Sequence, residues 1–517
     1  AADAAVAQIL SLAGVGRDGP RLAELETSST AAFEQYIRAA RASADGRASS
    51  EIAALDAAIA LDSSFGSALL LRAGIAREHG DTALLRRLTT RLARVRPRLS
   101  ERDRLHWDAS QALHAGDRTR AERLARELVV RFPRDPRGHD MLADLYFVTG
   151  RWREMEQLLR ETLALDSLGM SAGDGPCVPC VTYGRLVEVQ WRRGDREGAE
   201  RTARRWVEVQ PASANAHHHL AKVLARLRRG AEAERHMLRA VSLSGGDPGQ
   251  QVALARVYLM TRNLDAVDSL LRAWDRSGSP AYDAARPDIR SLLTLERGDL
   301  RPGVIALQRA LAADPRMRWL ELVLGTLHGR MGDYRSATTL LESHGHLQPG
   351  PVKLPLDATA ARNFAWSHAL LADAIAPSGD TVRLRALADS IALVAPSSYF
   401  GRDWTLHHHV RGLIAMHGRR YAEAEREFQR ARWGAAGWTR TVVELAKAQL
   451  AQGRARDAMV TLRDAYEWPD AMGRYQAVRE TDSLMAEARR RIPAHQQIPL
   501  GALPSGDSVR LNRLLLQ

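Results

Sequence analysis

Lysine, aromatic residues and long apolar runs are all scarce in this chain of 517 residues. Aromatic residues make up 5% of it, whereas Ala, Leu, Arg and Glu are abundant, a composition that suits soluble helices. No apolar run approaches the roughly 18 residues that a membrane-spanning helix requires. The sequence therefore predicts helices and no transmembrane segment.

Lysine occurs only at positions 222, 353 and 447, although the formal net charge is +13. The other basic residues are arginines, which we interpret mainly as the codon bias of a GC-rich genome. A strongly basic chain suggests nucleic acid or an acidic partner. The arginines are dispersed and often paired with Glu or Asp, without a dense run interleaved with aromatics. We therefore expect no nucleic-acid partner.

One pattern occurs twice between residues 298 and 349. Gly298-Asp299 opens the first copy, Gly332-Asp333 opens the second, and a proline closes each copy. Glycine adopts the left-handed conformation that ends a helix, aspartate caps the next helix, and proline stops it. A 34-residue period of this kind resembles the helix-turn-helix signature of tetratricopeptide repeats.

The small residues Gly325 and Ala337 lie where the two helices of the Gly332 unit should cross most closely. One hairpin cannot bury its own apolar face, so stacked neighbours are needed. We predict an all-α, tetratricopeptide-like, right-handed superhelical solenoid of about 11 to 12 helical hairpins. The predicted segments are an N-terminal helix and loop (1–26), repeats (27–166), an inserted loop (167–183), repeats (184–349), an irregular helical segment (350–400), repeats (401–470), and C-terminal helices with a tail (471–517).

Residues 24–73 and 98–136 resemble the repeat regions that bacteria attach to membrane serine/threonine kinases, adenylate cyclases and winged-helix regulators. The matching positions are Ser28, Ser29, Ala32, Tyr36, Ala58, Ile59, Ala60, Leu61, Asp62 and Phe65. The resemblance implies a bacterial source and covers residues 24 to about 210. The chain has no kinase catalytic loop or phosphate-binding lysine strand, so such a module would lie outside it.

Cys177 and Cys180 are the only cysteines, and both lie in the inserted loop. A thioredoxin-like motif would need a βαβ unit, haem attachment would need a histidine at position 181, and zinc would need two further ligands. A local disulfide is the leading interpretation, and reduced structural thiols or a metal or redox role are the alternatives. A disulfide predicts a periplasmic or extracellular protein.

Two short motifs match catalytic or phosphate-binding patterns without the required context. Gly14, Gly16 and Gly19 match G-x-G-x-x-G, but a helix precedes them and a proline follows. Residues 169–173 match G-x-S-x-G, but they lie in a solenoid loop instead of a strand-to-helix turn. We interpret both as loops and predict a non-catalytic chain without cofactor or metal.

Histidine triplets occur at 217–219 and 407–409, both in predicted first helices. Consecutive helical residues point about 100° apart, so a triplet cannot present three imidazoles to one metal. His218, Lys222 and Arg226 are spaced four apart on the helix face that is expected to line the inner groove, where they could bind an acidic group. Trp191 is a further groove candidate, with core packing as the alternative.

These observations predict a scaffold that binds a peptide or protein subunit in its concave groove. The alternative is a sensory or regulatory region of a bacterial signalling protein, whose catalytic module lies outside this chain. The sequence names neither the ligand nor the oligomeric state.

Overall fold

The computed structural model describes residues 27–44, 48–78, 81–133, 136–165, 178–315, 317–344, 358–434, 438–466 and 478–493. Within these ranges the regular elements are all helical, which confirms the predicted all-α class. The first helices are α2 (Thr30–Ala44), α3 (Ala48–Leu61), α4 (Gly66–Glu78), α5 (Thr82–Val95), α6 (Glu101–His114), α7 (Arg118–Arg131), α8 (Pro136–Thr149) and α9 (Trp152–Leu165). The next are α10 (Val178–Arg192), α11 (Arg196–Val209), α12 (Ala214–Arg226), α13 (Gly230–Leu243), α14 (Pro248–Thr261), α15 (Leu264–Ser277), α16 (Ala285–Arg297), α17 (Arg301–Ala313), α18 (Trp319–Arg330) and α19 (Tyr334–His344). The last are α20 (Ala358–Ile375), α21 (Thr381–Val394), α22 (Gly401–Trp404), α23 (Leu406–His417), α24 (Tyr421–Ala431), α25 (Thr439–Ala451), α26 (Ala455–Arg463) and α27 (Val478–Arg490).

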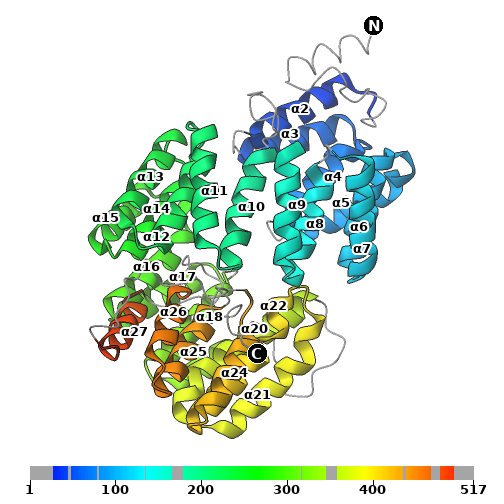
Figure 1. Ribbon diagram of the computed structural model, residues 1–517. Coiled ribbons are helices and arrows are strands. Elements are labelled where there is room, and N and C mark those ends of the chain that lie inside the picture. Colours follow the sequence, from blue (N-terminus) through cyan, green and yellow to red (C-terminus); the bar gives the residue numbers. More distant parts are fainter. Residues whose placement is uncertain are drawn as a thin grey trace. The chain divides into compact units, whose positions relative to one another are not determined.

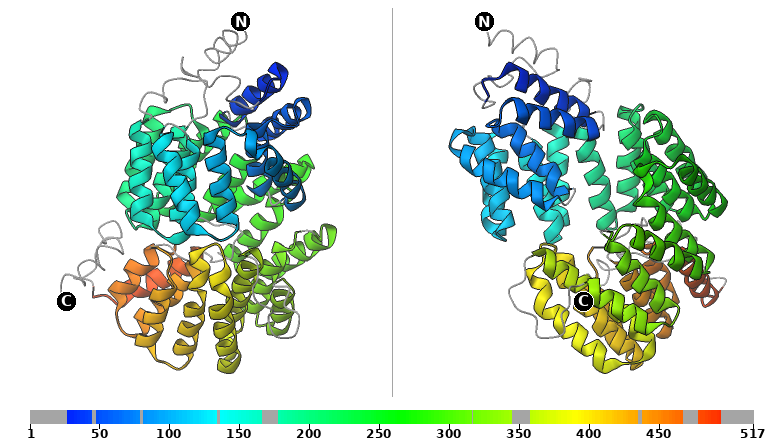
Figure 2. Two further views of the ribbon diagram at one scale, coloured as in Figure 1. Left: turned by 90° about the vertical axis from the view of Figure 1, so that its right-hand side faces the viewer. Right: turned by 180° about the vertical axis from the view of Figure 1, so that it is seen from behind.

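The chain divides into two compact units. Unit 1 comprises Ala1–Tyr146 and Glu154–Arg185, and unit 2 comprises Phe147–Arg153 and Leu186–Gln517. In both units consecutive helices pack as antiparallel pairs, and successive pairs stack on one another (Figures 1 and 2). This arrangement is the tetratricopeptide-like solenoid that the 34-residue period predicts.

The predicted turn chemistry is present at the ends of the first helices. Gly332 has a φ of 80°, in the left-handed region that glycine adopts without strain. The carboxylate of Asp333 accepts a hydrogen bond of 3.1 Å from the backbone N–H of Ser336, so it caps α19. Asp195 caps α11 in the same way, through the N–H of Gly198 at 2.8 Å. These local predictions are confirmed.

Arginine replaces the turn glycine in three repeats. Arg228, Arg262 and Arg419 have φ values of 64°, 61° and 55°. With Gly194, the first two extend the series at 34-residue intervals (194, 228, 262), and Arg419 precedes Gly453 by the same interval. The period therefore continues through units whose sequences are degenerate. Neighbouring structure must hold these arginines, because a left-handed non-glycine residue costs about 1 kcal/mol.

Close helix crossings depend on glycine, as predicted for Gly325. A Cβ atom added there would lie 2.5 Å from Cγ of Leu341 on the second helix. Gly412 has the same role in a later pair, where an added Cβ would overlap the ring of Phe428. A larger residue at either position would push the two helices apart.

Each unit has its own apolar core. Phe33, Phe65, Leu69 and Leu92 are fully buried in unit 1. The largest cluster of unit 2 spans residues from Val187 to Leu327 and also includes residues of α25, α26 and α27. The last helix therefore packs with repeats that lie much earlier in the chain. Over the described part of the chain, no helix is long and apolar enough to cross a membrane.

Some sequence predictions concern residues outside the described ranges. They include the segment 1–26, the G-x-S-x-G match at 169–173, Cys177 and the side chain of Cys180. Residues 358–394, in the segment predicted to be irregular, form the helical pair α20 and α21.

Candidate functional site

The predicted groove residues lie on α10 and α12, the first helices of adjacent pairs in unit 2. His218, Lys222 and Arg226 follow one another at intervals of four residues and so share one face of α12. This face turns towards Glu188 of α10, a residue that the sequence analysis did not identify. Since Glu188 precedes Lys222 by 34 positions, one repeat length, the two occupy equivalent places in consecutive repeats.

Glu188 is the centre of a cationic cluster. Its Oε2 lies 3.4 Å from Nζ of Lys222 and 3.3 Å from Nη1 of Arg226. Its Oε1 accepts a hydrogen bond of 3.0 Å from Nε of Arg192 on the same helix. Three cations therefore surround one carboxylate, and we call these four residues the Glu188 cluster. Contacts between charged groups of this kind are stronger than neutral hydrogen bonds.

Trp191 does not line an exposed groove surface. Only 3% of it is exposed, and it belongs to the main core cluster of unit 2. The guanidinium carbons of Arg226 and Arg196 lie 4.9 and 5.6 Å from its ring centroid. Of the two interpretations of Trp191, groove residue or core packing, its low exposure and these cation–π contacts fit core packing. Trp191 supports the Glu188 cluster by positioning Arg226.

His218 adds no positive charge to this surface at neutral pH. Burial is the main cause that lowers its pKa to about 4, and the nearby Lys222 and Arg256 lower it further. Its Nδ1 lies 2.9 Å from Oε1 of Gln250 on α14. Because an amide oxygen accepts only, Nδ1–H must be the donor and Nε2 is left as an acceptor. While neutral, His218 cannot form an ion pair with a carboxylate.

Three other histidines of the two triplets pack between helices, and Nδ1 of His408 lies 2.8 Å from Oε2 of Glu427. His217 stacks on His236 with 5.2 Å between the ring centroids, and His219 lies 5.2 Å from the ring of Trp206. His409 is fully buried against Trp438. The search for His, Cys, Asp and Glu groups that could hold a metal finds none over the described ranges.

The first helices of the following repeats continue the polar contacts. Gln250 donates to Oδ1 of Asn215 at 3.3 Å, and Nη2 of Arg256 lies 3.2 Å from Oδ2 of Asp288. Like Glu188 and Lys222, these partners are about one repeat apart. A comparison of positions about 34 residues apart in the sequence could therefore have identified these paired residues.

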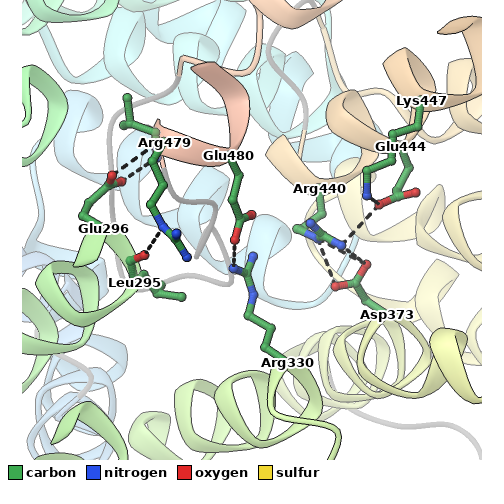
Figure 3. Close-up of polar contacts among 10 residues, drawn as sticks. Leu295, Glu296, Arg330, Asp373, Arg440, Glu444, Lys447, Arg479 and Glu480 are labelled. Atoms are coloured by element: carbon green, nitrogen blue, oxygen red, sulfur yellow. Dashed lines mark hydrogen bonds and ion pairs between the residues drawn. The ribbon is translucent and has the colours of Figure 1, made fainter. Parts of the chain in front are cut away.

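A second polar region forms where α27 meets the C-terminal end of α16. The backbone N–H groups of Val478 and Arg479 donate to the carboxylate of Glu296, at 2.5 and 3.2 Å. Nε of Arg479 donates to the carbonyl of Leu295 at 2.8 Å (Figure 3). Glu296 therefore caps a helix 182 residues later in the chain, and the α16 carbonyl end faces the positive end of α27.

Two ion pairs extend this contact along α27. Nη1 of Arg330, at the end of α18, donates to Oε1 of Glu480 at 2.7 Å (Figure 3). Nη2 of Arg228 donates to Oδ2 of Asp482 at 3.0 Å, and the guanidinium of Arg228 lies 4.9 Å from the ring centroid of Tyr466. These partners of α27 come from three earlier first helices or their turns, and the hydroxyl of Tyr466 also donates to Asp482 at 2.7 Å.

A buried ionic group lies next to Arg330. Asp373 of α20 binds Arg440 of α25, and Arg440 also lies 3.3 Å from Glu444, which accepts from Lys447 at 2.7 Å (Figure 3). Burial raises the pKa of Asp373, but Arg440 and His409 outweigh it and hold that pKa below its usual range. These charges are paired, as buried charges must be.

One series of polar contacts in this region resembles a catalytic triad. Oγ1 of Thr441 lies 3.0 Å from Nδ1 of His409, and Nε2 of His409 lies 3.5 Å from Oδ1 of Asp373. Thr441 and His409 are each 0% exposed, so no substrate reaches the hydroxyl. The series joins α20, α23 and α25 and holds the fold.

No family model matches the chain, and no curated protein matches it either. Similar solved structures exist at low sequence identity. One is a tetratricopeptide repeat protein from Parabacteroides merdae, with 11% identity and a TM-score of 0.33, covering 61% of this chain and 98% of that one. A second is pilF from Pseudomonas aeruginosa, with 15% identity and a TM-score of 0.30, covering 43% and 96%.

A third is the APC/C hetero-tetramer Cut9-Hcn1, with 11% identity and a TM-score of 0.29, covering 89% of this chain and 97% of that one. No ligand or partner is transferred from these proteins. The assignment to a tetratricopeptide-like solenoid rests on the chain's own 34-residue pattern of helical pairs.

Proposed function

We propose that the chain is a non-catalytic scaffold that binds an acidic segment of a protein at the Glu188 cluster. The observation that carries this proposal is the convergence of Arg192, Lys222 and Arg226 on the carboxylate of Glu188. A ligand carboxylate would supply a second counter-charge to cations that are already positioned. Charge-assisted hydrogen bonds of this kind contribute roughly 1.5–3 kcal/mol each.

Lys222 is the cation best suited to reach a ligand. Its side chain is 20% exposed, whereas that of Arg226 is 1% exposed and lies over Trp191. The 3.4 Å contact of Lys222 with Glu188 is long for a charge-assisted hydrogen bond. Arg226 and Arg192 hold Glu188 in place, and Lys222 makes the proposed contact.

A pair of opposite substitutions tests this function. Fluorescence anisotropy with a labelled acidic peptide array would be measured for Lys222→Met and Glu188→Gln. Lys222→Met should weaken binding about tenfold because one charge-assisted hydrogen bond is lost. Glu188→Gln should strengthen binding, because it removes the internal carboxylate that competes with the ligand. The matched control is Arg239→Met, an exposed arginine on the second helix α13.

A purely structural cluster would give a different result. Both Lys222→Met and Glu188→Gln would then lower the thermal stability, and neither would change peptide affinity. If acidic peptides bind equally to the parent chain, to Lys222→Met and to Arg239→Met, the proposed site is wrong.

The alternative proposal is a regulatory repeat region whose catalytic module lies elsewhere in the gene. It draws on the resemblance of residues 24–73 to kinase-linked repeat regions. Several matching residues are packing residues in this chain: Ala32, Ala58 and Phe65 are 0% exposed, and Ser29 caps α2 through the N–H of Ala32 at 3.1 Å. The resemblance therefore supports a repeat fold more than a signalling role. Sequencing the native gene on both sides of this segment tests the alternative.

A further inference from the structure

We propose that the surface that receives α27 is a helix-binding site, which the chain fills with its own C-terminal helix and which a partner helix can occupy instead. The surface consists of Glu296, Leu295, Arg330 and Arg228. It uses residues other than the Glu188 cluster, so the inference goes beyond the function proposed above. The expected partner is an amphipathic helix with carboxylates in its first two turns.

The receiving surface recognises a helix amino terminus. Glu296 is 5% exposed, and burial raises the pKa of its carboxyl, while the N–H groups of Val478 and Arg479 oppose that shift. Nε of Arg262 lies 3.7 Å from this carboxylate, which is longer than a hydrogen bond. The docked helix therefore supplies the donors that compensate the burial of Glu296.

Gly298 makes room for the same helix end. It has a φ of 85°, and a Cβ atom at this position would lie 2.7 Å from Nη1 of Arg479. The turn glycine of this repeat therefore both ends α16 and allows the Arg479 side chain to cross it. In three other turns arginine replaces glycine, so the glycine here has a role beyond the turn.

The second feature of the surface is its charge. Arg330 pairs with Glu480, the third residue of α27, and Arg228 pairs with Asp482, the fifth. Burial lowers the pKa of Arg330, and Arg440 beside it adds repulsion, so Arg330 needs an opposing carboxylate. A partner helix must therefore carry acids at these positions, in addition to a free amino-terminal turn.

The third feature is an apolar stripe. Val478, Met485, Ala488 and Ile492 are all at most 9% exposed and belong to the main core cluster of unit 2. The spacings of seven and three residues place Val478, Met485 and Ala488 on one face of α27, and Ile492 follows the end of the helix. The contact therefore has the general form of a helix in a groove, with apolar anchors on one face and charged pairs beside them.

The attachment of α27 in the same chain explains why a partner would have to compete. A segment linked to its site has an effective concentration in the millimolar range, so an identical free peptide binds the intact chain weakly. A substitution in α27 weakens the contact and leaves the residues of the receiving surface unchanged. A free helix should then be able to bind that surface.

The test uses the full chain with Glu480→Arg and a synthetic peptide of residues 478–492, acetylated at its amino terminus and labelled at its carboxyl terminus. Hydrogen exchange of α27 should accelerate about tenfold or more in this variant, because an ion pair becomes a repulsion. The labelled peptide should bind Glu480→Arg at least tenfold more tightly than the parent chain. The matched control is Glu487→Arg, because Glu487 pairs with Arg491 of the same helix.

A charge exchange then tests the site itself. The peptide carrying Glu480→Arg should fail to bind the Glu480→Arg chain and should bind the chain that carries Arg330→Glu. If the Glu480→Arg chain does not melt cooperatively, Glu480→Gln replaces it, and accelerated exchange confined to α27 is then required. Unchanged exchange of α27, or no saturable peptide binding to the opened chain, would show that α27 is a fixed part of the fold.

The test of the α27 surface and the test of the Glu188 cluster can give independent results. Lys222→Met should leave binding of the 478–492 peptide unchanged, and Arg330→Glu should leave the effect of Lys222→Met on acidic peptides unchanged. Either proposal can therefore fail while the other stands.

Discussion

Arg440 binds Asp373 through both carboxylate oxygens, although 67 residues and an intervening helical pair separate them. Nε of Arg440 lies 3.0 Å from Oδ2 and Nη2 lies 3.3 Å from Oδ1. The two side chains are 17% and 9% exposed. Such a bidentate pair fixes the positions of α20 and α25 relative to each other within unit 2.

Arg440→Met should lower the free energy of unfolding by about 3–5 kcal/mol, because it leaves a buried carboxylate without its main partner. Urea denaturation of the parent and the variant measures this difference. The control is Arg205→Met, which removes an exposed pair with Glu208 and should cost less than about 1 kcal/mol. Equal losses in both variants would contradict a stabilising role for Arg440.

The Asp373–Arg440 pair also predicts how the free energy of unfolding changes with pH. The pKa of Asp373 is lower in the folded than in the unfolded chain, so its ionisation stabilises the fold above the unfolded pKa of about 4. That contribution is lost as the pH falls towards the folded pKa. Asp373→Asn should therefore lose less stability than the parent chain between pH 5 and pH 3, as measured by urea denaturation at each pH.

Gly325→Ala should destabilise unit 2 by about 1–3 kcal/mol, because the new Cβ would lie 2.5 Å from Cγ of Leu341. The matched control is Gly74→Ala in α4, where a Cβ would have no heavy atom within 4 Å. That substitution should be neutral or stabilise by up to about 1 kcal/mol, since it removes freedom from the unfolded chain. Thermal unfolding of both variants measures the contrast.

His218 should titrate with a pKa of about 4, compared with 6.5 for an exposed histidine. Because the unfolded chain takes up this proton first, stability should fall as the pH drops from 6.5 to 4, by roughly 3 kcal/mol in total. The charged groups near the imidazole are Lys222 and Arg256, and both oppose protonation. Nuclear magnetic resonance of labelled histidines reads the pKa directly, and a value near 6.5 would contradict the buried placement.

Cys177 and Cys180 are predicted to form a local disulfide. Intact mass of the native protein after alkylation, with and without prior reduction, counts the free thiols. An oxidised pair would support an exported protein, because such bonds persist in oxidising compartments. Two free thiols would remove the main support for export.

The sequence alone determined the features that depend on neighbours within one repeat. Gly332 and Asp333 could be assigned because a left-handed glycine and an aspartate cap act within a few residues. The 34-residue period predicted the helical pairs for the same reason. The period was hidden at Arg228 and Arg262, since a left-handed arginine leaves no sequence signal.

The tertiary structure decided which side chains meet. Lys222 and Arg226 could be placed on one helix face from their spacing, but only the stacked helices reveal Glu188 as their counter-charge. Burial of Trp191 depends on Arg196 and Arg226, which no local pattern predicts. The contact of Glu296 with α27 joins residues 182 positions apart. Helix formation is local, whereas the pairing and burial of charges follow from the path of the whole solenoid.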